Sequence, residues 1–323
     1  MNKIIKKKYN LLSIIFSLLF IYGLFLIIKD FNVIIEKINQ IEIHVFFLAT
    51  IIYFLSVIFR FIRWKIIYKE VLGNYKFNIL RETIIGYMAN NLFPFRLGEI
   101  YRVKRITDFE KVKFVKVLST IFAERFTDVI ALLLLLFISL PFINKIDLNY
   151  IEINNKTLIY YLISILFLLI FFSFLCISSF SAIKIIRKKI INISLSLLEF
   201  FISKRKPSLY FKIFTLSILI WVIEAFVYFY IAHQFITQIS EINLFFIILI
   251  VCSITNLSGI IPSLPGNIGN FEFFGTMTFL ILGINSEIGA SIIITVHIVL
   301  FIPITFIGFI MLISEKKRFY IKQ

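Results

Sequence analysis

Apolar stretches long enough to cross a membrane run through the whole chain and constrain its fold more than any other feature. A transmembrane helix needs about 20 predominantly apolar residues. Of all residues, 60% are hydrophobic, above the roughly 45–50% of globular proteins. The sequence therefore predicts an all-α polytopic membrane bundle, one transmembrane domain over residues 1–323. Its segments number about eight: 11–28, 44–62, 78–94, 115–141, 157–180, 210–232, 243–263 and 288–313.

Two apolar stretches are marginal as complete spans. Residues 78–94 carry Arg81 and Glu82 near their start. Residues 271–283 would reach only about 20 Å at 1.5 Å per residue, short of a ~30 Å hydrocarbon core. We therefore expect broken or re-entrant helices at both places. If the first enters from the cytoplasm and the second, with 243–263, from outside, they form an inverted repeat whose tips meet near mid-membrane.

The charge distribution indicates a membrane topology. The chain has 34 Lys and Arg against 18 Asp and Glu, but the basic residues lie at the ends of apolar segments. That placement follows the positive-inside rule, so we predict no nucleic-acid partner. The loops that carry these basic residues all lie on one side of the membrane if residues 78–94 enter and leave the membrane from that side. This predicts a multi-pass protein of the cell (plasma) membrane with both termini in the cytoplasm.

Residues 183–203 have an amphipathic pattern. Ile186, Ile190 and Ile193 recur at helical spacing, beside the basic residues 187–189. Such a stripe predicts an interfacial helix lying on the anionic inner leaflet. A cytoplasmic connector packed on the rest of the protein fits the pattern equally well.

Residues 90–99 gather polar and helix-breaking side chains among apolar segments. Irregular backbone and charge inside a membrane usually line a cavity or pathway. Arg96 offers a planar fork that matches a phosphate or carboxylate, and Glu99 could hold it or accept a proton. A cytoplasmic turn with a surface ion pair is the alternative. The residues concerned are Asn90, Asn91, Pro94, Arg96, Gly98 and Glu99.

Further ionisable residues are expected inside the membrane. Glu124 and Asp128 share one helix face, and Glu124 lies about 13 Å into a helix that starts near residue 115. With Arg125 between them, they predict a salt-bridge network or a substrate site. Glu224 stands alone in its segment. Either it is protonated and serves as a relay, or it pairs with an arginine of another helix, for which Arg125 or Arg96 is the expected partner.

Residues 262–272 repeat this chemistry in the second half of the chain. Pro262, Pro265, Gly266 and Gly269 break the helix, with Asn267, Asn270 and Glu272 around them. A half-helix that begins near Asn270 would point its positive N-terminal end into the membrane, towards an anionic group. A tight turn between two spans is the alternative.

The sequence contains no pattern typical of an enzyme. It shows no Ser-His-Asp order, phosphate-binding loop, zinc pattern or Rossmann glycine set in a suitable context. His44, His233 and His297 form no ligand-spaced cluster, and we interpret them as interfacial or packed residues. We therefore predict no cofactor, no metal and no catalytic residue.

Three patterns, in this order, resemble the transmembrane region of the lysylphosphatidylglycerol synthases and its stand-alone relatives. They are Asn-Asn-x-x-Pro-x-Arg-x-Gly-Glu at 90–99, Glu-Arg-x-x-Asp at 124–128 and Pro-Gly-x-x-Gly-x-x-Glu at 265–272. The resemblance extends over nearly the whole chain. It departs at Asn267, where the family pattern usually has a second consecutive glycine.

The resemblance implies a role in lipid movement. In bifunctional members of this family, the membrane region is associated with flipping an aminoacylated phospholipid that a soluble domain makes. This chain ends at Gln323 without such a domain, so the resemblance implies no aminoacyl transfer.

Different classes of function therefore fit these residues. The leading hypothesis is a lipid flippase or transporter-like protein that holds the polar or anionic head group of a phospholipid or polyprenyl-linked lipid in an intramembrane cavity. The alternatives are a membrane enzyme that modifies a lipid or lipid-linked sugar, and a non-transporting partner of a membrane complex. A homo-oligomer or a membrane enzyme partner is also compatible with the sequence. The predicted substrate-binding residues are Asn90, Asn91, Arg96, Glu99, Glu124, Arg125, Asp128, Glu224, Gly266, Asn267, Gly269 and Glu272.

Overall fold

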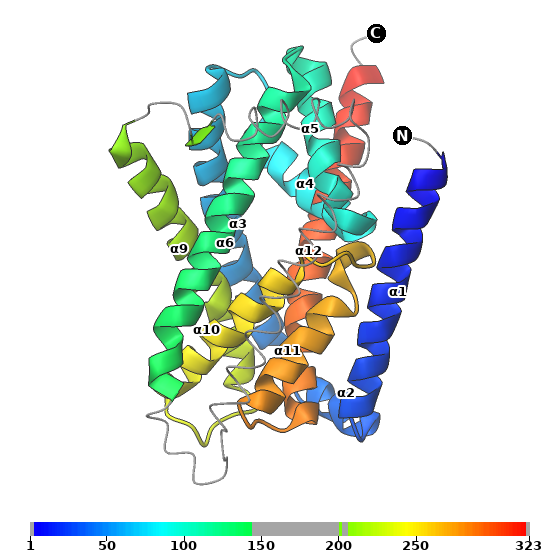
Figure 1. The fold of residues 1–323 in the computed structure, drawn as a ribbon, viewed down its shortest axis with the longest axis vertical. Helices are drawn as coiled ribbons and strands as arrows, with labels where there is room; N and C mark the ends of the chain where they lie inside the picture. The colour runs from blue at the N-terminus through cyan, green and yellow to red at the C-terminus, as the bar shows by residue number, and fades with distance from the viewer. Residues whose placement is uncertain (1–2, 144–199, 202–205, 321–323) are drawn as a thin grey trace, which may run out of the picture.

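The structure, a computed structural model, describes residues 3–143, 200–201 and 206–320. Within these residues the named elements are helices (Figure 1), which confirms the all-α prediction. The predicted segment 157–180 lies outside the described residues, as does 183–203 apart from Phe200 and Phe201. The elements are α1 Lys3–Ile27, α2 Phe31–Asn39, α3 Ile43–Leu72, α4 Ile79–Leu92, η1 Pro94–Arg96, α5 Leu97–Glu110, α6 Phe114–Ile143, α9 Pro207–Ala232, α10 Glu241–Ser258, η2 Pro265–Asn267, α11 Asn270–Ile281 and α12 Ser286–Tyr320.

Several of these helices can cross a membrane. In the described part of the chain, α3, α9, α10 and α12 are long and apolar enough by length and composition. A fifth candidate joins residues 14–27 of α1 to α2 across a bend of 91°. The predicted membrane bundle is therefore confirmed, whereas the predicted count of about eight segments is not.

Two helical hairpins contain the predicted interruptions. The first hairpin consists of α4 and α5, joined at the tip 93–96; the second consists of α10 and α11, joined at the tip 259–269. The apolar pattern predicts α4, α10 and α11 but not α5. That helix is rich in charged residues and has a negative mean hydropathy, so hydropathy alone does not reveal it.

The two hairpins enter the bundle from opposite ends. In Figure 1, the outer ends of α4 and α5 lie near the top, where α1 begins and α12 ends, whereas α10 and α11 have their outer ends at the bottom, beside α2. The helical parts of the two tips, η1 and η2, contact each other in the middle of the bundle. This is the arrangement expected of an inverted repeat, in which two half-spanning elements meet near mid-membrane.

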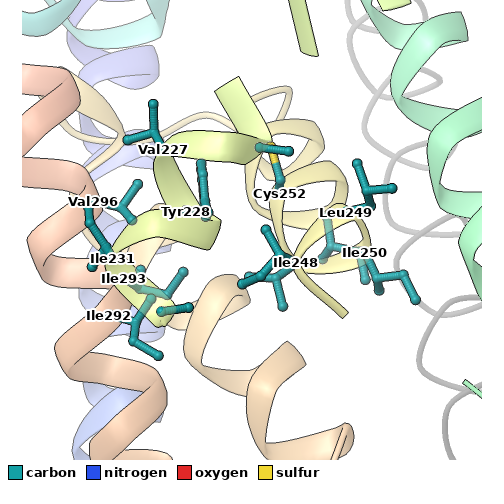
Figure 2. Close-up of a cluster of buried hydrophobic side chains, with 14 of the residues drawn as sticks. Val227, Tyr228, Ile231, Ile248, Leu249, Ile250, Cys252, Ile292, Ile293 and Val296 are labelled. Atoms are coloured by element: carbon teal, nitrogen blue, oxygen red, sulfur yellow. The ribbon is translucent and has the colours of Figure 1, made fainter. Parts of the chain in front are cut away.

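A buried apolar cluster attaches the second hairpin to the long helices. Figure 2 shows side chains of α9, α10 and α12 packed together, none more than 5% exposed. Dense packing of this kind has little freedom to rearrange, so it holds the second tip in place. The labelled side chains are Val227, Tyr228, Ile231, Ile248, Leu249, Ile250, Cys252, Ile292, Ile293 and Val296.

Small residues let the first hairpin pack closely. A Cβ atom at Gly98 of α5 would lie 2.2 Å from the backbone nitrogen of Asn90 on α4. At Gly308 of α12, it would lie 2.5 Å from Cβ of Met88, also on α4. Close backbone approach at small residues is typical of helix packing in membranes. The first hairpin is therefore folded tightly on itself and held against α12.

Candidate functional site

The two hairpin tips adjoin each other. A Cβ atom at Gly259 of the second tip would lie 2.1 Å from Nη2 of Arg96 in the first. The Asn91 side chain fixes the end of α4 by donating to Oγ1 of Thr305 at 2.8 Å and to the Phe301 carbonyl at 3.2 Å, both on α12. The predicted meeting of the two interrupted segments is therefore found in the structure.

A cavity of about 560 Å³ lies where the tips meet. Its wall is formed by both hairpins, including their tips, together with side chains of α3, α6, α9 and α12. A volume of this size is typical of a small-molecule site. The charged, histidine or amide side chains along the wall are Arg60, Asn90, Asn91, Arg96, Glu99, Arg125, Asp128, Glu224, Asn256, Asn267 and His297.

A buried ion-pair network forms one side of this cavity. Arg63 of α3 donates to Oδ1 of Asp128 at 2.6 Å and lies 3.3 Å from Oε1 of Glu124, both on α6. Arg102 of α5 reaches the other oxygen of Glu124 at 2.8 Å. Buried charges are tolerated when they are paired and hydrogen-bonded. The network therefore connects α3 and α6 to the first hairpin.

Two further arginines complete the network. Arg60 pairs with Glu224 of α9 and its guanidinium lies 4.4 Å from the centroid of the Trp221 ring. Arg125 lies within ion-pair distance of three carboxylates, Glu99 at 3.2 Å, Glu124 at 3.1 Å and Asp128 at 3.4 Å. Four arginines thus face four carboxylates, and their formal charges cancel: Arg60, Arg63, Arg102 and Arg125 against Glu99, Glu124, Asp128 and Glu224.

Arg96 stands outside this balance. Its backbone is left-handed, with φ 52°, where the first tip turns into α5. Within the described ranges, no carboxylate lies at ion-pair distance from its guanidinium, and the side chain lines the cavity. The cavity wall therefore carries one positive charge without a partner among the residues that the structure describes.

The second tip has an irregular backbone. Gly266, Asn267 and Gly269 have φ of 69°, 63° and 93°, a region in which glycine is favoured and asparagine is tolerated. This explains how Asn267 occupies a position where the family pattern has glycine. The carboxylate of Glu272 caps α11 by accepting from the Gly269 backbone N–H at 2.8 Å, so this part of the predicted half-helix end is already occupied.

His297 of α12 connects that cap to the tip. Its Nδ1 contacts Oε1 of Glu272, and its Nε2 lies 2.9 Å from the Gly266 carbonyl oxygen. The ring of Phe271 lies beside the imidazole, with 4.5 Å between ring centroids. The second tip is thus held to α12 by one histidine.

Most of the residues predicted to bind substrate line one cavity. Nine do so: Asn90, Asn91, Arg96, Glu99, Arg125, Asp128, Glu224, Gly266 and Asn267. Three lie outside the lining: Glu124 is buried in the ion-pair network, Gly269 packs against Ser17 of α1, and Glu272 lies behind His297. Substrate binding by any of the twelve stays a prediction.

Sequence reasoning missed three residues in this site, and it assigned Glu224 to other partners. Glu224 pairs with Arg60, not with Arg125 or Arg96. Arg60 and Arg63 resemble flanking charges when the segment is taken to end at residue 62, but α3 continues to Leu72 and contains them. A histidine alone in an apolar helix produces no pattern, so the location of His297 had no signal in the sequence.

Comparison with known protein families identifies a relationship over most of the chain. Residues 10–308 match the family model described as the lysylphosphatidylglycerol synthase TM region. No curated protein matches the chain. The matched span includes the three patterns at 90–99, 124–128 and 265–272, hence both hairpin tips and the α6 carboxylates.

Proposed function

From the premise that the chain belongs to the lysylphosphatidylglycerol synthase TM-region family, we propose that it is a flippase-like transporter of lipids with an anionic head group. The head group binds in the cavity between the two hairpin tips. The lipid is a phospholipid or a polyprenyl-linked lipid, and the protein works in the cell membrane with both termini in the cytoplasm.

The unpaired charge of Arg96 is the observation that carries this proposal. The four other arginines of the site are neutralised by four carboxylates, so an anion gains most at Arg96. A guanidinium offers planar, bidentate hydrogen bonds that match a phosphate. Away from bulk water, such a contact is stronger than at a surface.

The position of the cavity supports transport. The two hairpins enter the bundle from opposite ends (Figure 1), and residues of both tips line the cavity. Rocking of one hairpin relative to the other would open the cavity to one side at a time, as in transporters built from inverted repeats. Apolar side chains such as Leu132, Ile260 and Leu300 also line the cavity, where the hydrocarbon next to a head group can lie.

The decisive experiment measures transbilayer movement of fluorescent anionic, zwitterionic and aminoacylated phospholipids in proteoliposomes. Wild type should move an anionic class, and Arg96→Ala should abolish that movement. Arg96→Lys should retain part of it, because charge remains while the planar fork is lost. Lys104→Ala is the matched control, since this exposed basic residue of the same hairpin should behave like wild type.

Two results would contradict the proposal. Folded wild type that moves none of these phospholipids, nor a labelled polyprenyl phosphate, would exclude a flippase. Equal movement by wild type and Arg96→Ala would place the head group elsewhere.

A further inference from the structure

The contacts of His297 determine which of its ring nitrogens carries a hydrogen. The Gly266 carbonyl oxygen that faces Nε2 can only accept a hydrogen bond, so Nε2 carries a hydrogen and donates it. A neutral imidazole has a single N–H, so its Nδ1 would then be a bare acceptor. Yet Nδ1 contacts a carboxylate oxygen of Glu272.

A second proton is therefore required between Nδ1 and Glu272. It resides either on the ring, which gives an imidazolium beside a carboxylate, or on the carboxyl group, which then donates to Nδ1. Both forms have the same composition, namely one proton more than a neutral histidine beside a carboxylate. The pair consequently binds this proton as one unit.

We propose that the His297–Glu272 pair is a proton-binding site, and that its proton is coupled to anion binding at Arg96. This inference rests on the proposed function and adds the ion that is coupled to it. The two sites share one cavity, since Arg96, Gly266 and His297 all line it.

Loss of the proton has a structural consequence at the second tip. The neutral ring can donate from Nε2 to the Gly266 carbonyl oxygen, in which case Nδ1 presents a lone pair to the Glu272 carboxylate. Alternatively, it can donate from Nδ1 to Glu272, in which case Nε2 no longer donates to the Gly266 carbonyl oxygen. Either way, one of its two contacts with the second hairpin is lost. The tip backbone, already left-handed at Gly266 and Asn267, then has one support fewer on α12.

Loss of the proton also changes the charge of the cavity. With the proton bound, the pair is neutral, the network is balanced, and Arg96 adds one positive charge. Without it, the pair carries one negative charge, which offsets that of Arg96. A monoanionic head group therefore binds better to the protonated cavity, and by linkage its binding favours proton uptake.

The groups around the pair determine whether other charges compete for its proton. Within the described part of the chain, the only ion pair of Glu272 is with His297, and the rings of Phe271 and Phe301 lie next to the imidazole, which suits its cationic form. Tyr228 and Cys252 contact Asn256 of the cavity wall. The other titratable or charged groups along the cavity are Tyr53, Arg60, Tyr87, Arg96, Glu99, Arg125, Asp128 and Glu224.

Glu272→Gln provides a precise test because its amide can reproduce both contacts without a proton. The amide oxygen can accept from the Gly269 backbone, and the amide nitrogen can donate to Nδ1 of a neutral His297. The variant thus imitates the protonated pair at every pH. His233→Gln is the control, because its histidine is half-exposed at the C-terminal end of α9 and pairs with Glu241.

The experiment is calorimetric titration of detergent-solubilised protein with dihexanoyl phosphatidylglycerol, whose phosphodiester stays anionic. The titration is repeated at several pH values, and in buffers of different ionisation enthalpy to count the protons taken up on binding. Wild-type affinity should fall as pH rises, by about five- to 150-fold for a coupling of ordinary size, and binding should take up as much as one proton. Glu272→Gln should show neither effect, and His233→Gln should show both.

Wild-type pH dependence and proton uptake that persist in Glu272→Gln would overturn the proposal. If the probe fails to bind at any pH, the anion site of the proposed function fails, and the coupling with it. The ¹⁵N spectrum of the His297 ring, assigned by its loss in His297→Gln, then tests the proton site by itself. A neutral ring with an unprotonated Nδ1, together with a ¹³C signal of the Glu272 side chain that stays that of an ionised carboxylate, at every pH at which the protein stays folded would overturn that site too.

Discussion

Arg63 of α3 donates to Asp128 of α6 at 2.6 Å, with both side chains almost wholly buried. Asp128 also accepts from Nε1 of Trp221 on α9 at 3.0 Å. Three helices are therefore joined at one carboxylate. Because each charge is balanced by buried partners, the network is sensitive to the loss of any one of them.

Removing that carboxylate should destabilise the protein strongly. Asp128→Ala leaves the Arg63 charge buried with only one carboxylate nearby, a defect that costs about 3–5 kcal/mol. Thermal unfolding in detergent should show it as a large fall in Tm. Glu241→Gln, in an exposed pair with His233, is the control and should cost at most about 1 kcal/mol. Similar losses in both variants would argue against a buried network.

Arg96→Ala should leave stability nearly unchanged even though it abolishes transport. No described carboxylate pairs with Arg96, so its removal leaves no buried charge unpaired, and a change within about 1 kcal/mol is expected. Arg102→Ala is the contrast. It removes a buried ion pair with Glu124 and the stacking of the guanidinium 4.0 Å from the Trp64 ring centroid, and its Tm should fall sharply. A sharp fall in Arg96→Ala as well would make Arg96 structural.

Gly98→Ala should prevent the first hairpin from closing. The added Cβ would lie 2.2 Å from the Asn90 nitrogen and 2.5 Å from the Ala89 carbonyl carbon, and backbone atoms cannot move aside as a flexible side chain can. We expect a loss of monodisperse protein in size-exclusion chromatography. Gly73→Ala, where a Cβ atom meets nothing within 4 Å, carries only the backbone strain of φ 80° and ψ −140°, about 1–3 kcal/mol, and should remain monodisperse.

Asn267 should be replaceable by glycine but not by valine. Its φ of 63° suits glycine, whereas a β-branched residue in this conformation costs about 1–3 kcal/mol. Glycine loses only the hydrogen bond that Ser263 donates to the Asn267 side chain at 2.9 Å. Thermal unfolding of both variants checks the difference. Equal Tm values would show that the second tip does not constrain its backbone.

Cysteine labelling should confirm the predicted topology. Gln40 and Asn74 are exposed and flank the two ends of α3. With Cys176 and Cys252 replaced by alanine, a membrane-impermeant maleimide should label Gln40→Cys in intact cells, and Asn74→Cys only after permeabilisation. The reverse pattern would place both termini outside.

Local chemistry predicted much of the site. Arg96, Glu99 and Gly266 were identifiable because helix-breaking and charged residues are rare inside apolar segments. The positive-inside rule favoured opposite directions for the two hairpins, but the meeting of their tips in one cavity was decided by the tertiary structure. By contrast, α5 has the composition of a surface helix, and its place within the bundle depends on ion pairs such as that of Arg102 with Glu124.

The sequence by itself determined the all-α membrane bundle, the two interruptions and the family, because hydrophobicity and the backbone effects of proline and glycine act over a few residues. Only the tertiary structure decided which charges pair. Arg60 and Glu224 are separated by 164 positions in the chain, and their contact depends on how α3 and α9 are rotated against each other. The same packing left Arg96 outside the ion-pair network and placed His297 of α12 against the second tip, which no local pattern could reveal.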